Sequence, residues 1–255
     1  MNGNPAAALL QAETWIFDLD NTLYPASCNL FAQVDKHIGD FIARLLNVDA
    51  AEAYRIQKQY FRDYGTSLRG LMVHHDVDPL TFLEFVHAVD VSPVQPSPAL
   101  DRALGRLPGR KIVFTNGSTK HAENVMARLG VSRHFDAIFD IVAADYFPKP
   151  EPFVYDRLVR RHWIDPKRAV MVEDIARNLL PAHQMGMTTV LVRTEAEWAR
   201  DGIDGAHVHH VTDDLVAWLV GIAAMPAPEN AIDPGAASVD TSPGLASWSG
   251  PRRKA

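Results

Sequence analysis

The chain has 255 residues, of which 47% are apolar and 22% charged, so it can bury a sizeable core. This length predicts one domain with an insertion, or two small domains. The formal net charge is −6, and the sequence has no long run of lysine or arginine. A partner such as a nucleic-acid polymer is therefore not expected, because neutralising its phosphates needs clustered cations. A small phosphorylated substrate stays compatible with this composition.

Cysteine usage and apolar patterning predict a cytoplasmic location. Cys28 is the single cysteine, so no internal disulfide can form and a reducing compartment is the simpler expectation. No apolar stretch approaches the roughly 20 residues of a membrane-spanning helix. The first residues, MNGNPAAALLQAE, carry no basic segment before their short apolar run, so we expect neither a secretory signal nor a membrane partner.

Short apolar runs alternate with helical patterns along much of the chain. The runs are rich in Val, Ile or Phe and predict buried parallel strands at residues 14–19, 111–114, 138–143, 169–172 and 188–192. Apolar residues at helical spacing predict helices between the later runs, at residues 120–129, 151–161 and 175–185. Strand followed by helix, repeated, is typical of an α/β fold with a parallel sheet.

The interval between the first two strands has a different pattern, which predicts an inserted helical cap over residues 25–98. Its apolar residues follow helical spacing in two stripes, separated by a break near residues 47–49: Phe31, Val34, Ile38, Phe41, Ile42 and Leu45, then Ala53, Ile56 and Tyr60. Three prolines within residues 91–98 predict a stiff return hinge. The α/β core would then comprise residues 1–24 and 99–225. Residues 226–255 are rich in Pro, Ala, Ser and Gly, which predicts a disordered tail.

Polar residues follow the predicted strands at their carboxyl ends, where parallel sheets bind ligands. Asp18 and Asp20 come after the first strand, and alternation along a strand would place both on the same face. The second strand ends in Thr115-Asn116-Gly117-Ser118 before a helix, a suitable cradle for an anion. Glu173-Asp174 closes the fourth strand. Lys149 lies between prolines, earlier in the chain than this strand.

Convergence of these strand ends would place up to four carboxylates beside one lysine. Such a density of negative charge requires a cation to stay ionised. The expected ligands are all oxygens, which favours Mg²⁺ over zinc. The metal would also neutralise a substrate phosphate, so that a carboxylate can attack phosphorus.

Each of these features has an ordinary structural alternative when it is taken singly. Asp18 and Asp20 could form a solvated turn, Lys149 could lie in a surface loop, and Glu173-Asp174 could cap the following helix. Their occurrence in one consistent order, each at a predicted strand end, favours the functional interpretation.

These motifs resemble the haloacid dehalogenase-like superfamily. The resemblance spans residues 14–195 and rests on Asp18-x-Asp20-Asn21-Thr22-Leu23, Thr115-Asn116-Gly117, Lys149 and Glu173-Asp174. It implies a Rossmann-like core with a helical cap inserted after the first motif, an aspartyl-phosphate intermediate and Mg²⁺.

The resemblance implies separate roles for the two aspartates of the first motif. Asp18 would be the nucleophile and a metal ligand. Asp20 would be the general acid/base, and its backbone carbonyl would also bind the metal. Dehalogenases of the superfamily lack an acid at the position of Asp20, so its presence favours phosphoryl transfer over carbon–halogen hydrolysis.

The other motifs would bind the phosphoryl group and complete the metal site. By the same resemblance, Thr115 and the backbone of Asn116 would hold the transferring group, and Lys149 would neutralise it. Asp174 would be the remaining metal ligand, with Glu173 in support.

The last motif departs from the pattern of many relatives. Asn178 stands four positions after Asp174, where those relatives have a second acidic residue. The adjacent Glu173 could compensate for the missing acidic residue. We therefore expect the departure to affect the outer shell of the metal site and not the presence of the metal.

The cap carries the information about the substrate. Its segment from Tyr64 to Pro79 resembles the cap of the pyrimidine 5′-nucleotidase subfamily, as do the stretches FDLDNTLYP and FPKPEP. Tyr64, Arg69, His74 and His75 could stack on a base or hydrogen-bond to it. They could equally belong to an ordinary turn between helices.

We therefore interpret the sequence as a Mg²⁺-dependent phosphomonoesterase that hydrolyses nucleoside 5′-monophosphates, pyrimidine preferred, through a phospho-Asp18 intermediate. A phosphatase or phosphomutase for sugar phosphates would share the same catalytic core, so only the cap distinguishes them. A catalytically inactive binding or scaffold protein is the alternative from another class.

Overall fold

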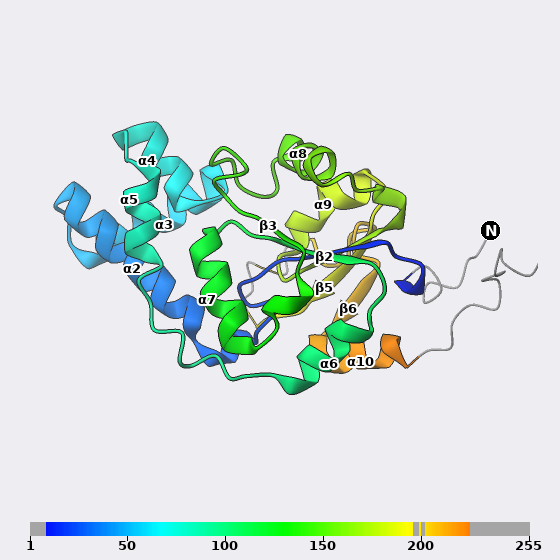
Figure 1. Cartoon of the computed structure of the whole chain (residues 1–255). Helices are drawn as coiled ribbons and strands as arrows, with labels where there is room; N and C mark the ends of the chain where they lie inside the picture. Colours follow the sequence, from blue (N-terminus) through cyan, green and yellow to red (C-terminus); the bar gives the residue numbers. More distant parts are fainter. Residues whose placement is uncertain (1–8, 196–198, 200–201, 225–255) are drawn as a thin grey trace, which may run out of the picture.

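The computed structural model describes residues 9–195, 199 and 202–224, and the predicted tail at 226–255 lies outside them. Within the described residues the strands form one fully parallel sheet in the order β3-β2-β1-β4-β5-β6 (Figure 1). Their bounds are Thr14–Phe17 (β1), Arg110–Phe114 (β2), Ala137–Phe139 (β3), Ala169–Glu173 (β4), Thr188–Val192 (β5) and His210–Thr212 (β6). The predicted α/β class and Rossmann-like core are confirmed.

Two strands differ from the sequence prediction, each for a local reason. The strand predicted at 138–143 ends at Phe139, because the Asp140 carboxylate accepts hydrogen bonds from the backbone of Thr119 and of Ala143 and turns the chain. Strand β6 was missed in the prediction. It is a three-residue edge strand of sequence His-Val-Thr, with no buried residue, so it lacks an apolar signal.

Helices cover both faces of the sheet (Figure 1). One face packs on α6 (Pro98–Arg106), α7 (Thr119–Leu129) and α10 (Leu215–Ala223), and the other on α8 (Pro152–His162) and α9 (Ala176–Gln184). In the central strand β1, Trp15 and Phe17 enter the first core and Ile16 the second. Every residue of β1 is buried, which explains its continuous apolar run.

Four helices between β1 and β2 form a bundle beside the sheet (Figure 1). They are α2 (Leu30–Leu46), α3 (Ala50–Tyr64), α4 (Ser67–His75) and α5 (Pro79–Val86), and they enclose a third apolar core, to which Ile141 from the segment after β3 also belongs. The predicted break between the two apolar stripes is real. Asn47 ends α2 in a left-handed conformation, and Asp49 caps α3 by accepting a hydrogen bond from the Glu52 N–H.

The predicted hinge at residues 91–98 lies within the connection between α5 and α6, except that its last residue already belongs to α6. Pro98 occupies the first turn of α6, and the Ser97 hydroxyl caps that helix. At the other end of the bundle, Leu30 packs in the core of the sheet, although it belongs to α2. The cap limits at residues 25 and 98 stay a prediction. Each described helix falls short of the length and apolarity needed to cross a membrane.

Gly109 marks a close approach between the strand β2 and the segment before β1. Its φ is +72°, and a Cβ atom there would lie 2.4 Å from the carbonyl oxygen of Glu13. That carbonyl accepts the hydrogen bond from the Arg110 N–H that begins the pairing of the two strands. A glycine is therefore required at this position both for its conformation and for space.

We predict that Gly109→Ala lowers the free energy of unfolding by about 2–5 kcal/mol, the sum of left-handed backbone strain and a steric clash. Gly130→Ala is the matched control. Gly130 has a similar φ of +79° but nothing within 4 Å of its Cβ position. That control should lose only about 1–2 kcal/mol in urea unfolding. Equal losses for the two variants would contradict the importance of the close approach.

Candidate active site

The predicted site residues meet where β1, β2 and β4 end. The strand order reverses at β1, which is the place where open α/β sheets bind ligands. Asp18 directly follows β1, and its N–H still donates to the carbonyl oxygen of Val172 at 2.9 Å. Thr115 follows β2, while Glu173 ends β4 and Asp174 comes next. The backbone ladder thus brings residues from distant parts of the chain to one edge.

Lys149 connects these strand ends. Its Nζ atom donates to Asp18 Oδ1 at 2.7 Å, to Glu173 Oε2 at 2.6 Å and to the carbonyl oxygen of Phe114 at 2.9 Å. Its backbone N–H donates to Asn116 Oδ1 at 2.9 Å. Burial lowers the pKa of Lys149, but the two carboxylates raise it above its ordinary value, so the ammonium stays charged.

The carboxylates around Lys149 outnumber it. Oxygen atoms of Asp18, Glu173 and Asp174 all lie within 4.8 Å of one another, and all three side chains are buried. Burial, followed by the charge of Glu173, raises the pKa of Asp18 to about 7. Burial, Glu173 and Asp18 raise the pKa of Asp174 well above its ordinary value. One ammonium cannot balance three buried carboxylates, so this group of oxygen donors fits a divalent cation.

Both oxygens of Asp18 are held in place. Lys149 donates to Oδ1, and the Thr22 hydroxyl donates to Oδ2 at 2.8 Å. Thr22 was part of the recognised motif, but the sequence analysis assigned it no role. Its contact with Asp18 fixes the plane of the carboxylate.

Asp20 forms its side-chain hydrogen bonds with residues that lie outside the carboxylate cluster. Its Oδ1 atom accepts from the Tyr24 hydroxyl at 2.5 Å and from His121 Nε2 at 2.8 Å. Burial raises the pKa of Asp20, but the contacts with His121 and Tyr24 outweigh burial and bring that pKa below its ordinary value. The role of the Asp20 backbone carbonyl as a metal ligand stays a prediction.

Neither His121 nor Tyr24 was predicted from the sequence to contact Asp20. Tyr24 is four residues after Asp20, and the left-handed Asn21 helps to turn the chain back between them. That spacing was a usable signal. His121 is 101 residues away from Asp20, and no local pattern indicates such a pairing.

The segment after β2 leads directly into α7. Thr115 Oγ1 accepts from the Gly117 N–H at 2.9 Å, and the Ser118 hydroxyl caps α7 by accepting from the His121 N–H. Asn116 uses its side chain to hold the backbone of Lys149. The assignment of Thr115 and of the Asn116 backbone to phosphate binding stays a prediction.

Asn178, the departure in the last motif, is buried in α9. Its side chain is 2% exposed, and Oδ1 has no hydrogen-bond partner among the described residues. A buried amide oxygen without a partner fits a place in the outer shell of a bound cation.

The cap contacts the segment that carries Lys149. Gly65 has a φ of +81°, and a Cβ there would lie 2.8 Å from Pro148 and 3.4 Å from the Lys149 carbonyl oxygen. The Arg69 guanidinium lies 3.9 Å from the centre of the Phe147 ring. The turn between α3 and α4 therefore packs against the active-site segment.

The cap residues singled out from the sequence divide into two groups. Arg69 reaches the Phe147 ring, whereas His74 and His75 form hydrogen bonds to the hydroxyls of Tyr64 and Tyr60 within the cap. His74 and His75 lie in the helix α4, not in a loop. Their pairing inside the cap favours the ordinary structural alternative for the two histidines.

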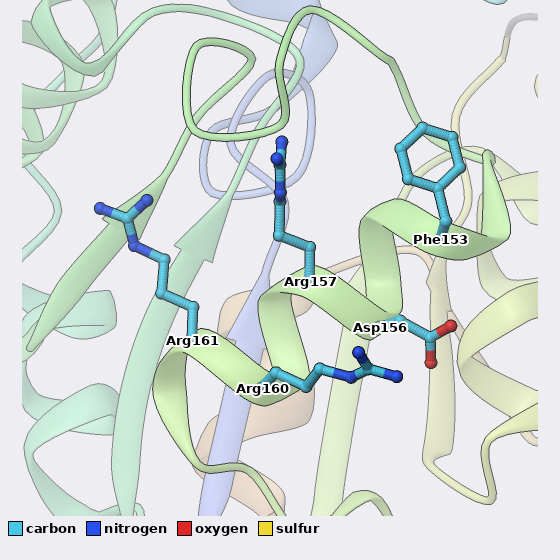
Figure 2. Close-up of a pocket in the computed structure, with 5 residues that line it drawn as sticks. All are labelled: Phe153, Asp156, Arg157, Arg160 and Arg161. Atoms are coloured by element: carbon cyan, nitrogen blue, oxygen red, sulfur yellow. The ribbon is translucent and has the colours of Figure 1, made fainter.

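A separate hollow lies on the outer side of α8 (Figure 2). Figure 2 shows Arg157, Arg160 and Arg161 on this helix, with Phe153 and Asp156. None of the predicted site residues lines it. The opposite side of α8 is buried, so this hollow is the solvated polar side of an amphipathic helix.

We predict opposite effects of Asp174→Asn on the metal-free and metal-bound protein. Loss of one crowded carboxylate relieves repulsion, so the metal-free melting temperature should rise by about 2–4 °C for a gain of about 1 kcal/mol. Millimolar Mg²⁺ should raise the melting temperature of the unaltered protein but not of the variant.

The exposed Asp145→Asn variant is the matched control for this experiment, since its ion pair with Arg157 lies at the surface. It should respond to Mg²⁺ as the unaltered protein does. Equal Mg²⁺ shifts for Asp174→Asn and Asp145→Asn would show that Asp174 does not hold the cation.

Two curated relatives and one solved structure are similar to this chain. "Phosphate metabolism protein 8" of Saccharomyces cerevisiae is 27% identical over 197 residues, covering 70% of this chain and 61% of the yeast protein, so the chain spans about three fifths of that relative. "Glyceraldehyde 3-phosphate phosphatase" of Methanocaldococcus jannaschii is 27% identical over 194 residues, 69% of this chain and 83% of its own. The crystal structure of a HAD phosphatase from Thermococcus onnurineus shares the fold, with a TM-score of 0.57 and 18% identity over 83% of this chain and 98% of that one.

The match to a family agrees with the geometry of the site. The family of haloacid dehalogenase-like hydrolases matches residues 13–186, which include the ends of β1, β2 and β4 and the segment that carries Lys149. The chain therefore belongs to the haloacid dehalogenase-like hydrolase family.

Proposed function

We propose that this protein is a Mg²⁺-dependent phosphomonoesterase that acts on small phosphorylated substrates through a phospho-Asp18 intermediate. The observation that carries the proposal is the placement of Asp18 in contact with the Lys149 ammonium and within 4.8 Å of carboxylate oxygens of Glu173 and Asp174. Such a site pairs a fixed nucleophile with the positive charge that a phosphate needs. The similarity to the archaeal relative, which is named as a phosphatase, supports the same reaction class.

The reaction would proceed in two displacements at phosphorus. An oxygen of Asp18 attacks, the bond between phosphorus and the ester oxygen breaks, and Asp20 gives a proton to the departing oxygen. Asp20 then takes a proton from water, which attacks the phosphorus of the acyl phosphate, releases inorganic phosphate and restores Asp18. The cation, held by Asp18 and Asp174, would supply charge neutralisation between carboxylate and phosphate.

For the substrate we propose nucleoside 5′-monophosphates, with pyrimidine bases preferred. Flat groups of the cap pair with the core beside the site: Arg69 lies over Phe147, and the Arg177 guanidinium lies 4.7 Å from the Phe61 ring centre. Aromatic rings and guanidinium groups are surfaces on which a base can stack. The resemblance of the cap to pyrimidine 5′-nucleotidases supports the same choice. We also propose that the protein is located in the cytoplasm.

Sugar phosphates are the second candidate class. The archaeal relative is named for glyceraldehyde 3-phosphate and covers most of the described chain. The catalytic residues would be the same for either class, so only measured substrate preference separates them.

We predict that Asp18→Asn lowers the Mg²⁺-dependent release of phosphate by at least about 10³-fold, because the amide cannot attack phosphorus. Asp145→Asn, at the surface and outside the site, should leave the rate unchanged. Phosphate release is measured with Mg²⁺ and with EDTA, and circular dichroism verifies the fold. Substantial turnover by Asp18→Asn would show that the nucleophile is assigned wrongly.

We also predict that kcat/KM for UMP and CMP exceeds that for glyceraldehyde 3-phosphate by about tenfold or more, since base contacts are worth about 1–3 kcal/mol. A tenfold preference in the opposite direction would assign the enzyme to sugar phosphates and leave the phosphomonoesterase proposal standing. Release of phosphate from none of these substrates would contradict the enzyme proposal itself.

A further inference from the structure

The carboxylate of Asp20 is anchored by one oxygen. Tyr24 and His121 both donate to Oδ1, at 2.5 Å and 2.8 Å, and within the described part of the chain no hydrogen bond ends on Oδ2. Oδ1 accepts both hydrogen bonds whether Oδ2 is ionised or carries the proton that Asp20 donates, so the His121 Nε2 atom is protonated in this contact. Two donors on one oxygen fix the rotation of the side chain and leave the other oxygen available for proton transfer.

From this geometry we propose that His121, together with Tyr24, is a positioning residue that orients Asp20 for proton transfer to the departing ester oxygen. The inference rests on the proposed phosphomonoesterase function. It adds to the proposed catalytic residues two residues that act through Asp20. Neither His121 nor Tyr24 needs to touch the substrate for this role.

His121 is itself rigidly held, as a positioning residue must be. Its side chain is 1% exposed, and its backbone N–H donates to the hydroxyl of Ser118 at the start of α7. The imidazole ring of His87 stacks on that of His121, with ring centres 4.5 Å apart and planes 12° from parallel. His87 Nδ1 lies 2.9 Å from the same Ser118 hydroxyl.

The stack joins the cap to the core. His87 follows α5 in the cap, whereas His121 lies in α7 beside the sheet. Gly117 lies beside both rings, since a Cβ atom there would be at ordinary contact distance, 3.5 Å, from His121 Cδ2 and from His87 Nε2. The cap thus supplies one face of the pocket that keeps His121 in contact with Asp20.

A positioning role for the acid predicts a dependence on the leaving group. An alkyl phosphate such as UMP releases a basic alkoxide, which needs a proton as the bond to phosphorus breaks. p-Nitrophenyl phosphate releases an acidic phenol that can depart as the anion. kcat/KM reports the steps up to this departure, so misorientation of Asp20 should lower kcat/KM for UMP selectively.

The experiment measures kcat/KM for UMP and for p-nitrophenyl phosphate, with Mg²⁺, in variants of His121. His121→Leu should lower kcat/KM for UMP by about 100-fold and that for p-nitrophenyl phosphate by less than about threefold. His121→Gln places an amide donor near the former Nε2 position and should recover most of the loss for UMP. If UMP is a poor substrate, the best alkyl phosphate among the nucleotides and sugar phosphates replaces it.

His134→Leu is the matched control. His134 Nε2 contacts the carboxylate of Asp101 at the same 2.8 Å, and both residues lie outside those assigned to catalysis. Its removal should leave the ratio of the two kcat/KM values unchanged. Tyr24→Phe removes only the second donor to Asp20, and it should reproduce the selective loss if His121→Leu fails to fold.

Loss of both kcat/KM values in equal proportion, in His121→Leu and in Tyr24→Phe, would overturn the positioning role in favour of a merely structural one. Unchanged values in both variants would overturn it as well. Failure of the proposed function has a different signature, since the unaltered protein would then release phosphate from neither substrate.

Discussion

The bridge from the Lys149 ammonium to Asp18 and Glu173 is the interaction on which the site depends. It is made in a buried place, where an unpaired charge of either sign is costly. Lys149 also binds the carbonyl oxygen of Phe114, so one cation ties the ends of β1, β2 and β4 together. The same contact that stabilises the strand ends holds Asp18, the proposed nucleophile, in one orientation.

This bridge leaves a deficit of positive charge that the chain does not remove. Asp174 adds a third buried carboxylate, and burial, followed by the charge of Glu173, raises the pKa values of both Asp18 and Asp174. Without a bound cation, repulsion among these buried carboxylates raises the free energy of the folded state. In this family member the unfavourable electrostatics and the proposed chemistry have one origin, because the same deficit attracts both a divalent cation and, through it, a phosphate.

Cap and core meet at the two groups that the proposed reaction needs most. Gly65 and Arg69 pack against the segment that carries Lys149, and His87 stacks on the histidine that holds Asp20. The proposed nucleophile and acid are thereby supported by different parts of the cap. In the proposed reaction, packing would couple substrate selection to catalysis, because the cap surfaces that support the reacting groups would also bound the substrate.

Local sequence determined the elements and most of the candidate site. Continuous Val, Ile and Phe runs predicted the buried parallel strands, because a strand covered on both faces has no polar alternation. Since carboxyl ends of parallel strands share one edge, the positions of Asp18, Glu173 and Asp174 followed from those runs alone. The short strand β6 and the early end of β3 did not follow, because the first has no apolar signal and the second depends on hydrogen bonds that Asp140 makes with the backbone.

Tertiary structure decided which side chains surround each carboxylate. Nothing in the sequence near Asp20 or near His121 indicates that they touch, because their contact arises only when α7 packs beside the end of β1. The stack of His87 on His121 likewise requires the cap to be placed on the core. Periodicity and composition report which residues are buried and in which element, whereas a contact between distant elements depends on how their surfaces pack, which neither pattern encodes.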